Sequence, residues 1–158
     1  MAGSPVRSLI VDTSVAVKWF SREDGTEAAL KLRDDLIHGQ IELSAPDLLL
    51  YELANVLRHH PRFSAEDVSA AVTSVLDLGI RFVPPSANLL AEAARLAFDR
   101  KITVTDAAFV TLAGLEGTIL VTADKRLAGR ADDKDRILAL SEYRDSSGRE
   151  LNPFDSQG

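Results

Sequence analysis

The chain has 158 residues, of which 46% are hydrophobic and 27% charged, as in a soluble domain large enough to bury a core. It has no cysteine, which excludes disulfides, thiolate metal sites and cysteine nucleophiles and agrees with a reducing cytoplasm. The formal net charge of −6 argues against a protein that coats nucleic acid through a basic face.

The acidic balance leaves a nuclease possible, because its acids hold cations while only a few basic side chains need line the approach. Candidates for that approach are Arg22, Lys125, Arg126 and Arg130. The apolar run 9–11 is too short for a signal peptide, and no stretch nears the roughly 20 apolar residues of a membrane span. We therefore expect a soluble cytoplasmic protein without a membrane partner.

In the first half of the chain, short apolar runs alternate with segments of helical spacing. Residues 6–11 predict a buried strand, and the next segments predict helices that end before Gly39. A brief strand and a helix beginning at Pro46 follow. The predicted elements are a strand at 6–11, helices at 13–20 and 24–37, a strand at 41–44 and a helix from 46 onward.

The second half repeats this alternation. Ser64, Ser86 and Thr105 are the expected N-caps of three helices, and Gly79 is expected to end the first of them. Strands are predicted at 80–83, 119–122 and 137–140, with a short helical turn near 125. This order indicates a three-layer α/β/α domain over residues 1–140 with a mainly parallel central sheet, followed by a polar tail at 141–158.

Two acidic residues follow predicted strands. Asp12 closes the first strand, and Asp124 follows the strand at 119–122. Ligands of parallel sheets bind outside the carboxyl ends of the strands, so both side chains are expected at a binding edge.

Two further acids lie on predicted helices. Asp106 is in the first turn of one helix, where the partial positive charge favours an ionised carboxylate. Glu52 lies on another, with Asn55 and His59 on the same polar stripe. If that stripe faces the strand ends, four oxygen-rich side chains converge.

Carboxylates beside a core are costly unless something pairs with them. No Lys or Arg accompanies these acids at comparable positions, so we expect a divalent cation as their partner. Carboxylates without thiolates suit Mg²⁺ or Mn²⁺ rather than Zn²⁺. Simpler explanations exist for each residue alone: Asp12 and Asp124 would cap the helices that follow them, Glu52 would be solvated, and Asp106 would be a favourable first-turn charge.

Four stretches of the sequence together resemble the PIN domain and, in length especially, the VapC-type toxins of toxin–antitoxin pairs. The resemblance is specific because the stretches occur in the family's order, although each alone is a weak signal. They are LIVDTSVAVKWF (9–20), PDLLLYELANVL (46–57), TVTDAAFVTLA (103–113) and LVTADKRL (120–127).

The resemblance implies a fold, a reaction and a set of site residues. In such proteins the matching acids bind Mg²⁺ or Mn²⁺ and cut single-stranded RNA, leaving a 5′-phosphate and a 3′-hydroxyl. Asp12 and Asp106 are the first choices for direct metal ligands, whereas Glu52 and Asp124 would bind through water or help activate the nucleophile. Accessory polar positions near the metal match Thr13 or Ser14 and Thr122.

The resemblance also implies partners. VapC-type proteins form homodimers, and a cognate antitoxin inserts a segment, often with a basic side chain, among the acids. The helices predicted at 64–77 and 86–98 are candidate contact surfaces, with core packing as their alternative role.

Other functions remain open at this point. The chain could be an RNA-processing PIN nuclease that is not a toxin, or a non-catalytic PIN-fold interaction module. A strand-end Asp followed by Thr-Ser also faintly resembles phosphoryl-transfer aspartates, but those phosphatases want a second Asp where this chain has Ser14. We expect Trp19 and Phe20 to pack in the core or a dimer rather than to stack on RNA bases.

Overall fold

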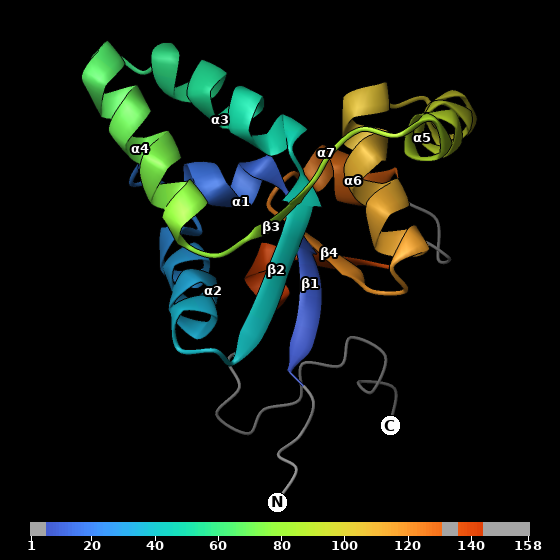
Figure 1. The fold of residues 1–158 in the computed structure, drawn as a ribbon, viewed down its shortest axis with the longest axis horizontal. Helices are drawn as coiled ribbons and strands as arrows, with labels where there is room; N and C mark the ends of the chain where they lie inside the picture. The colour runs from blue at the N-terminus through green and yellow to red at the C-terminus, as the bar shows by residue number, and fades with distance from the viewer. Residues whose placement is uncertain (1–5, 131–135, 144–158) are drawn as a thin grey trace, which may run out of the picture.

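A computed structural model describes residues 6–130 and 136–143. Its centre is a five-stranded sheet in the order β3-β2-β1-β4-β5, and every pairing between neighbours is parallel (Figure 1). The predicted α/β class and parallel sheet are confirmed. The strands are β1 (Arg7–Val11), β2 (Ile41–Pro46), β3 (Arg81–Val83), β4 (Ile119–Thr122) and β5 (Ile137–Ala139).

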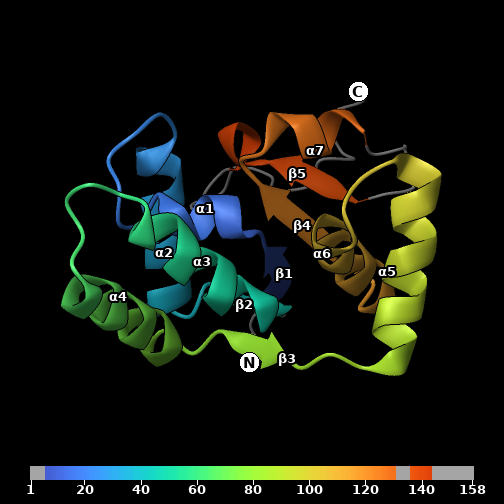
Figure 2. The same cartoon turned by 90° about the horizontal axis from the view of Figure 1, so that it is seen from above.

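Helices cover both faces of this sheet and make the expected three layers. Helices α1 to α4 lie on one side and α5 and α6 on the other, while α7 packs against β4 and β5 (Figure 2). None of the helices in the described part of the chain is both long and apolar enough to cross a membrane. The helices are α1 (Thr13–Val17), α2 (Thr26–Ile37), α3 (Leu48–Arg58), α4 (Ala65–Asp77), α5 (Ala87–Arg100), α6 (Val104–Leu115) and α7 (Lys125–Gly129), with a 3-10 turn η1 (Leu140–Glu142).

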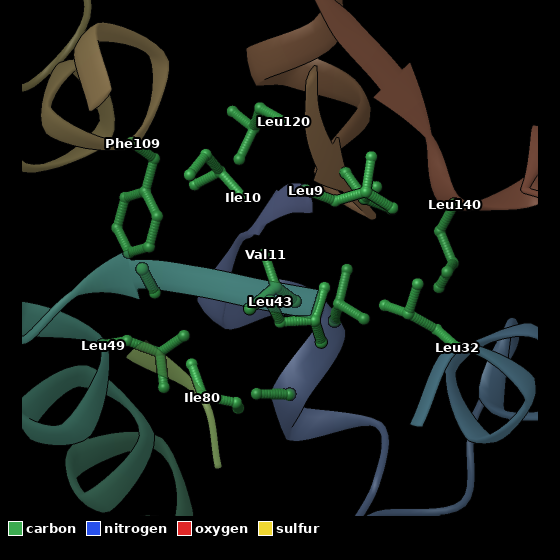
Figure 3. Close-up of a cluster of buried hydrophobic side chains, with 14 of the residues drawn as sticks. Leu9, Ile10, Val11, Leu32, Leu43, Leu49, Ile80, Phe109, Leu120 and Leu140 are labelled. Atoms are coloured by element: carbon green, nitrogen blue, oxygen red, sulfur yellow. The ribbon is translucent and has the colours of Figure 1, made fainter. Parts of the chain in front are cut away.

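The middle strand β1 is apolar throughout its second half because both of its faces are covered. Leu9, Ile10 and Val11 are all buried, so they do not alternate between core and solvent. Phe109 of α6 packs on one side of the strands, and Leu49 of α3 packs on the other (Figure 3). Trp19 is also buried and donates a hydrogen bond from Nε1 to the Ala29 carbonyl at 2.8 Å, which confirms its expected core role.

Local capping explains where several helices begin and end. Ser64 forms a capping box with Asp67, Ser86 caps α5, and Gly79 has a φ of 82° just after α4, as predicted. The expected cap at Thr105 is wrong. Thr103 caps α6 instead, because its hydroxyl accepts the Asp106 N–H at 3.0 Å, and this helix therefore starts at Val104.

Only residues 141–143 of the predicted tail are among the described residues. Within them Tyr143 is buried, and its hydroxyl donates to Asp35 Oδ2 of α2 at 2.5 Å. The start of the predicted tail is therefore tied to the body of the domain.

Candidate active site at the carboxyl edge of the sheet

Asp12 occupies the middle of the sheet's carboxyl edge. Its N–H donates to the Val121 carbonyl at 3.0 Å, which continues the β1–β4 register past the end of β1. Asp12 holds the N-cap position of α1, but its carboxylate makes no capping hydrogen bond. Capping therefore does not explain this side chain, which is 5% exposed.

Two hydroxyls hold the Asp12 carboxylate. Ser14 Oγ donates to Oδ2 at 2.6 Å, and Thr122 Oγ1 donates to the same oxygen at 2.8 Å. Oδ1 receives no hydrogen bond from any residue that the structure describes. One carboxylate oxygen is thus fixed by the protein, and the other is left for a ligand.

The same hydroxyls join the loops that follow β1 and β4. The Ala123 N–H donates to Ser14 Oγ at 2.9 Å, and the Asp124 N–H donates to Thr122 Oγ1 at 3.1 Å. Since Ser14 and Thr122 also donate to the Asp12 carboxylate, a shared hydrogen-bond network fixes the positions of Asp12 and Asp124 relative to each other.

Glu52 reaches this edge from α3. Thr13 Oγ1 donates to Glu52 Oε1 at 2.8 Å, across 39 positions of sequence, and the Glu52 side chain is half-buried. All three accessory residues expected near the site, Thr13, Ser14 and Thr122, thus bind one of the acids. The other members of the polar stripe, Asn55 and His59, are exposed.

Asp106 and Asp124 complete the edge from two helix N-termini. Asp106 lies in the first turn of α6 as predicted. Asp124 caps α7, because its Oδ1 accepts the N–H groups of Arg126 at 2.9 Å and Leu127 at 3.2 Å. The capping role considered for Asp124 is therefore confirmed. Its second oxygen, Oδ2, lies near Arg126.

The acids act on one another electrostatically. Burial raises the pKa of Asp12, hydrogen bonds from Ser14 and Thr122 lower it, and the charges of Asp106 and Asp124 raise it further. Burial likewise raises the pKa of Glu52, the Thr13 hydrogen bond opposes that rise, and the charges of Asp12 and Asp106 add to it. A positive charge placed among these carboxylates would therefore stabilise their ionised forms.

A basic side chain already lies at the edge of this cluster, contrary to our expectation that no Lys or Arg accompanies the acids. Arg126 Nη2 is 3.3 Å from Asp106 Oδ2 and 3.6 Å from Asp124 Oδ2. From the sequence we expected Arg126 only on the approach to the site. Its contact with Asp106 depends on the relative positions of α6 and α7, which no local pattern determines. The sequence feature that could have indicated this contact is the position of Arg126, two residues after Asp124 in the first turn of the helix that Asp124 caps.

The donor set suits a hard divalent cation in its chemistry. It consists of carboxylates and hydroxyls without thiolates, and Asp12, the most buried of the four acids, has one oxygen that accepts no hydrogen bond from the described residues. In this arrangement, however, no three His, Cys, Asp or Glu side chains among the described residues are grouped closely enough to form a ready-made metal site.

Comparisons with known proteins agree with this architecture. The PIN domain model matches residues 9–133. Ribonuclease VapC3 of Pyrobaculum aerophilum is 33% identical over 124 residues, which cover 76% of this chain and 92% of that protein.

Two solved structures share the fold at lower identity. VapBC2 of Rickettsia felis, bound to a promoter DNA fragment, superposes with a TM-score of 0.64 at 13% identity, covering 84% of this chain and 98% of that one. VapC20 of Mycobacterium tuberculosis, described as a sarcin-ricin loop cleaving toxin, gives 0.62 at 16% identity and covers 77% and 93%. These two likenesses concern the fold, whereas the matched family model and the 33% identical relative show that the chain is a PIN-domain protein of the VapC-like family.

Proposed function

We propose that this protein is a divalent-metal-dependent endoribonuclease that cuts single-stranded RNA and serves as the toxin of a toxin–antitoxin pair. The observation that carries the proposal is the gathering of Asp12, Glu52, Asp106 and Asp124, from separate elements, at the carboxyl edge of the sheet. The 33% identity to a protein named as a ribonuclease supports RNA as the substrate.

Each acid has a role that follows from its surroundings. Asp12, fixed through Oδ2, would offer Oδ1 to the cation, and Asp106, whose charge acts on Asp12, would be the second direct ligand. Glu52, whose pKa is raised by burial, is suited to accept a proton from the attacking water. Asp124 would bind the cation through water with the oxygen that does not cap α7.

The reaction is the hydrolysis of a phosphodiester by in-line attack of water. A Mg²⁺ or Mn²⁺ ion bound here would lower the pKa of water, orient the phosphodiester and neutralise the charge that develops on it. The water oxygen bonds to phosphorus as the bond to the 3′-oxygen breaks. The 3′-oxygen takes up a proton from solvent, which balances the proton that Glu52 accepts from the water, and the products are a 5′-phosphate and a 3′-hydroxyl.

Protein partners belong to the same proposal. Arg126 lies against Asp106 and Asp124, so a guanidinium fits beside these acids. This fit supports an antitoxin that places a basic side chain among them. We further propose a homodimer in the cytoplasm; exposed apolar residues such as Leu90 and Phe98 on α5 and Leu76 on α4 offer surface for protein contacts.

Cleavage of labelled single-stranded RNA by the purified full chain tests the proposal. We expect cutting with Mg²⁺ or Mn²⁺, none with EDTA, and a new 5′-phosphate on the downstream product. Asp12→Asn should abolish cleavage, whereas Asp77→Asn, an exposed acid at the end of α4, should not. Cutting that survives in Asp12→Asn protein would refute the metal-site assignment.

Further measurements separate the alternatives. A non-catalytic module would leave RNA intact with either metal yet retain a protein partner. An RNA-processing nuclease would cut RNA without arresting growth when expressed alone. For the toxin, we expect growth arrest that depends on Asp12 and is relieved by a co-expressed antitoxin.

A further inference from the structure

A cavity adjoins the acidic edge, and apart from Thr122 and Asp124 its lining residues have no role in the chemistry proposed above. It has a volume of about 480 Å³, within the roughly 300–1,000 Å³ typical of small-molecule sites. Thr122 and Asp124 form the wall that it shares with the acids. Because β4 and β5 end at this cavity, it occupies the edge of a parallel sheet where ligands bind.

The lining combines small apolar residues with two lysines and with the carboxylates of Asp24 and Asp124. Ala128 of α7, Ala139 of β5 and Leu140 of η1 contribute to its surface, and no bulky aromatic side chain is among the lining residues. Gly25, whose φ of 87° favours glycine, lines the far side next to Lys18 and Leu140. The result is an open slot with apolar walls.

The two lysines of this cavity differ in their availability. Lys18 is engaged, because its Nζ contacts Glu23 Oε1 at 3.0 Å and the Asp24 carbonyl at 2.6 Å. Lys125 is exposed and has no ion pair or hydrogen bond to the side chains that the structure describes. Its ammonium is thus available to a phosphate, the contact that supplies most sequence-independent affinity for nucleic acid.

These observations lead to one inference, which rests on the proposed function. We propose that the cavity holds one nucleotide next to the scissile phosphate, with its base between the apolar walls and a flanking phosphate on Lys125. A nucleotide is the fitting occupant because the cavity shares Thr122 and Asp124 with the acidic edge, so an RNA bound at these acids has the cavity beside it. Base preference at this one position is then set by the size of the slot.

The variant Ala128→Leu tests this directly. Leucine is a good helix former, and it adds bulk to the cavity from the half-buried Ala128 position of α7. Ala65→Leu, an exposed alanine in the first turn of α4, is the matched control. Mn²⁺ affinity and thermal stability should be unchanged in both variants, because an alanine side chain makes no hydrogen bond or ion pair with the acids and both substitutions leave the backbone hydrogen bond from Ala128 N–H to the Asp124 carbonyl in place.

Binding is measured first without catalysis. Each of the four nucleoside 5′-monophosphates is titrated into the Asp12→Asn protein in EDTA, with NMR amide shifts as the readout. We expect at least one nucleotide to shift the amides of Gly25, Ala128 and Ala139, and Ala128→Leu to weaken that binding tenfold or more. Shifts confined to other parts of the molecule, or equal binding by the Ala128→Leu protein, would overturn the proposal.

Cleavage then separates this inference from the function on which it rests. On a randomised single-stranded RNA, Ala128→Leu should cut at least tenfold more slowly or shift the base preference at one position beside the cut. Wild-type protein that never cuts RNA refutes the nuclease itself. Wild-type cutting that Ala128→Leu leaves unaltered in rate and sequence refutes only the nucleotide cavity.

Discussion

Replacement of Thr122 by valine removes a polar contact from the site with little change in shape. Thr122 is 1% exposed, and its hydroxyl donates to Asp12 Oδ2 at 2.8 Å while accepting the Asp124 N–H at 3.1 Å. A hydrogen bond to a charged group contributes about 1.5–3 kcal/mol. We therefore expect Thr122→Val to lower the free energy of unfolding by about 1.5–3 kcal/mol in EDTA, which is roughly 3–12 °C in Tm for a chain of this size.

The size of this loss should depend on pH. The hydrogen bond stabilises the ionised form of Asp12, so its removal raises the pKa of a carboxyl whose pKa burial has already raised. The destabilisation is full where Asp12 is ionised and shrinks as falling pH protonates it. Metal affinity should also fall, by about 10–100-fold, as when the residues that orient a ligand are lost.

Urea unfolding in EDTA between pH 4 and 8, with Mn²⁺ calorimetry at neutral pH, checks both effects. The matched control is Thr111→Val, a buried threonine of α6 whose side chain bonds to none of the described acids. We expect little change in that variant. A loss in Thr122→Val that is the same at every pH, or unchanged Mn²⁺ affinity, would show that Thr122 does not support the Asp12 carboxylate.

Three further predictions concern the charges in and around the site. Arg126→Ala should bind Mn²⁺ up to about fivefold more tightly in calorimetry, because the cation no longer competes with the exposed ion pairs from Arg126 to Asp106 and Asp124, which are worth about 0.2–1 kcal/mol. Weaker binding by the variant would mean that Arg126 supports the metal site. Tyr143→Phe should cost about 1–3 kcal/mol in urea unfolding, since buried Asp35 loses a donor, and an unchanged midpoint would contradict this. Burial raises the folded-state pKa values of Asp12 and Glu52, so above about pH 4 the native state binds more protons than the unfolded chain, and stability in EDTA falls as pH rises. Asp12→Asn should flatten this fall in urea unfolding, and an equal slope in both proteins would refute the prediction.

The order of the elements was predictable from sequence because it depends on local patterns. The buried run 9–11, the serine caps at Ser64 and Ser86 and the turn at Gly79 all appear where hydrophobic period and capping chemistry put them. The cap of α6 was misplaced by two residues, since Thr103 and Thr105 are equally suited by composition. Only the backbone at Thr103, with φ −70° and ψ 155°, decides between them.

In the candidate site, too, some features were predictable from local sequence and others depend on the tertiary structure. Sequence alone determined which acids follow strands or start helices, because a carboxylate after an apolar run is visible as a local pattern. Tertiary structure decided that Thr13 reaches Glu52 across 39 positions and that Thr122 reaches Asp12 across 110. Tertiary structure also decided that Arg126 contacts Asp106 and that a cavity lies beside Asp124. These contacts join residues far apart in the chain, and their geometry follows from the strand register and helix packing rather than from any local propensity.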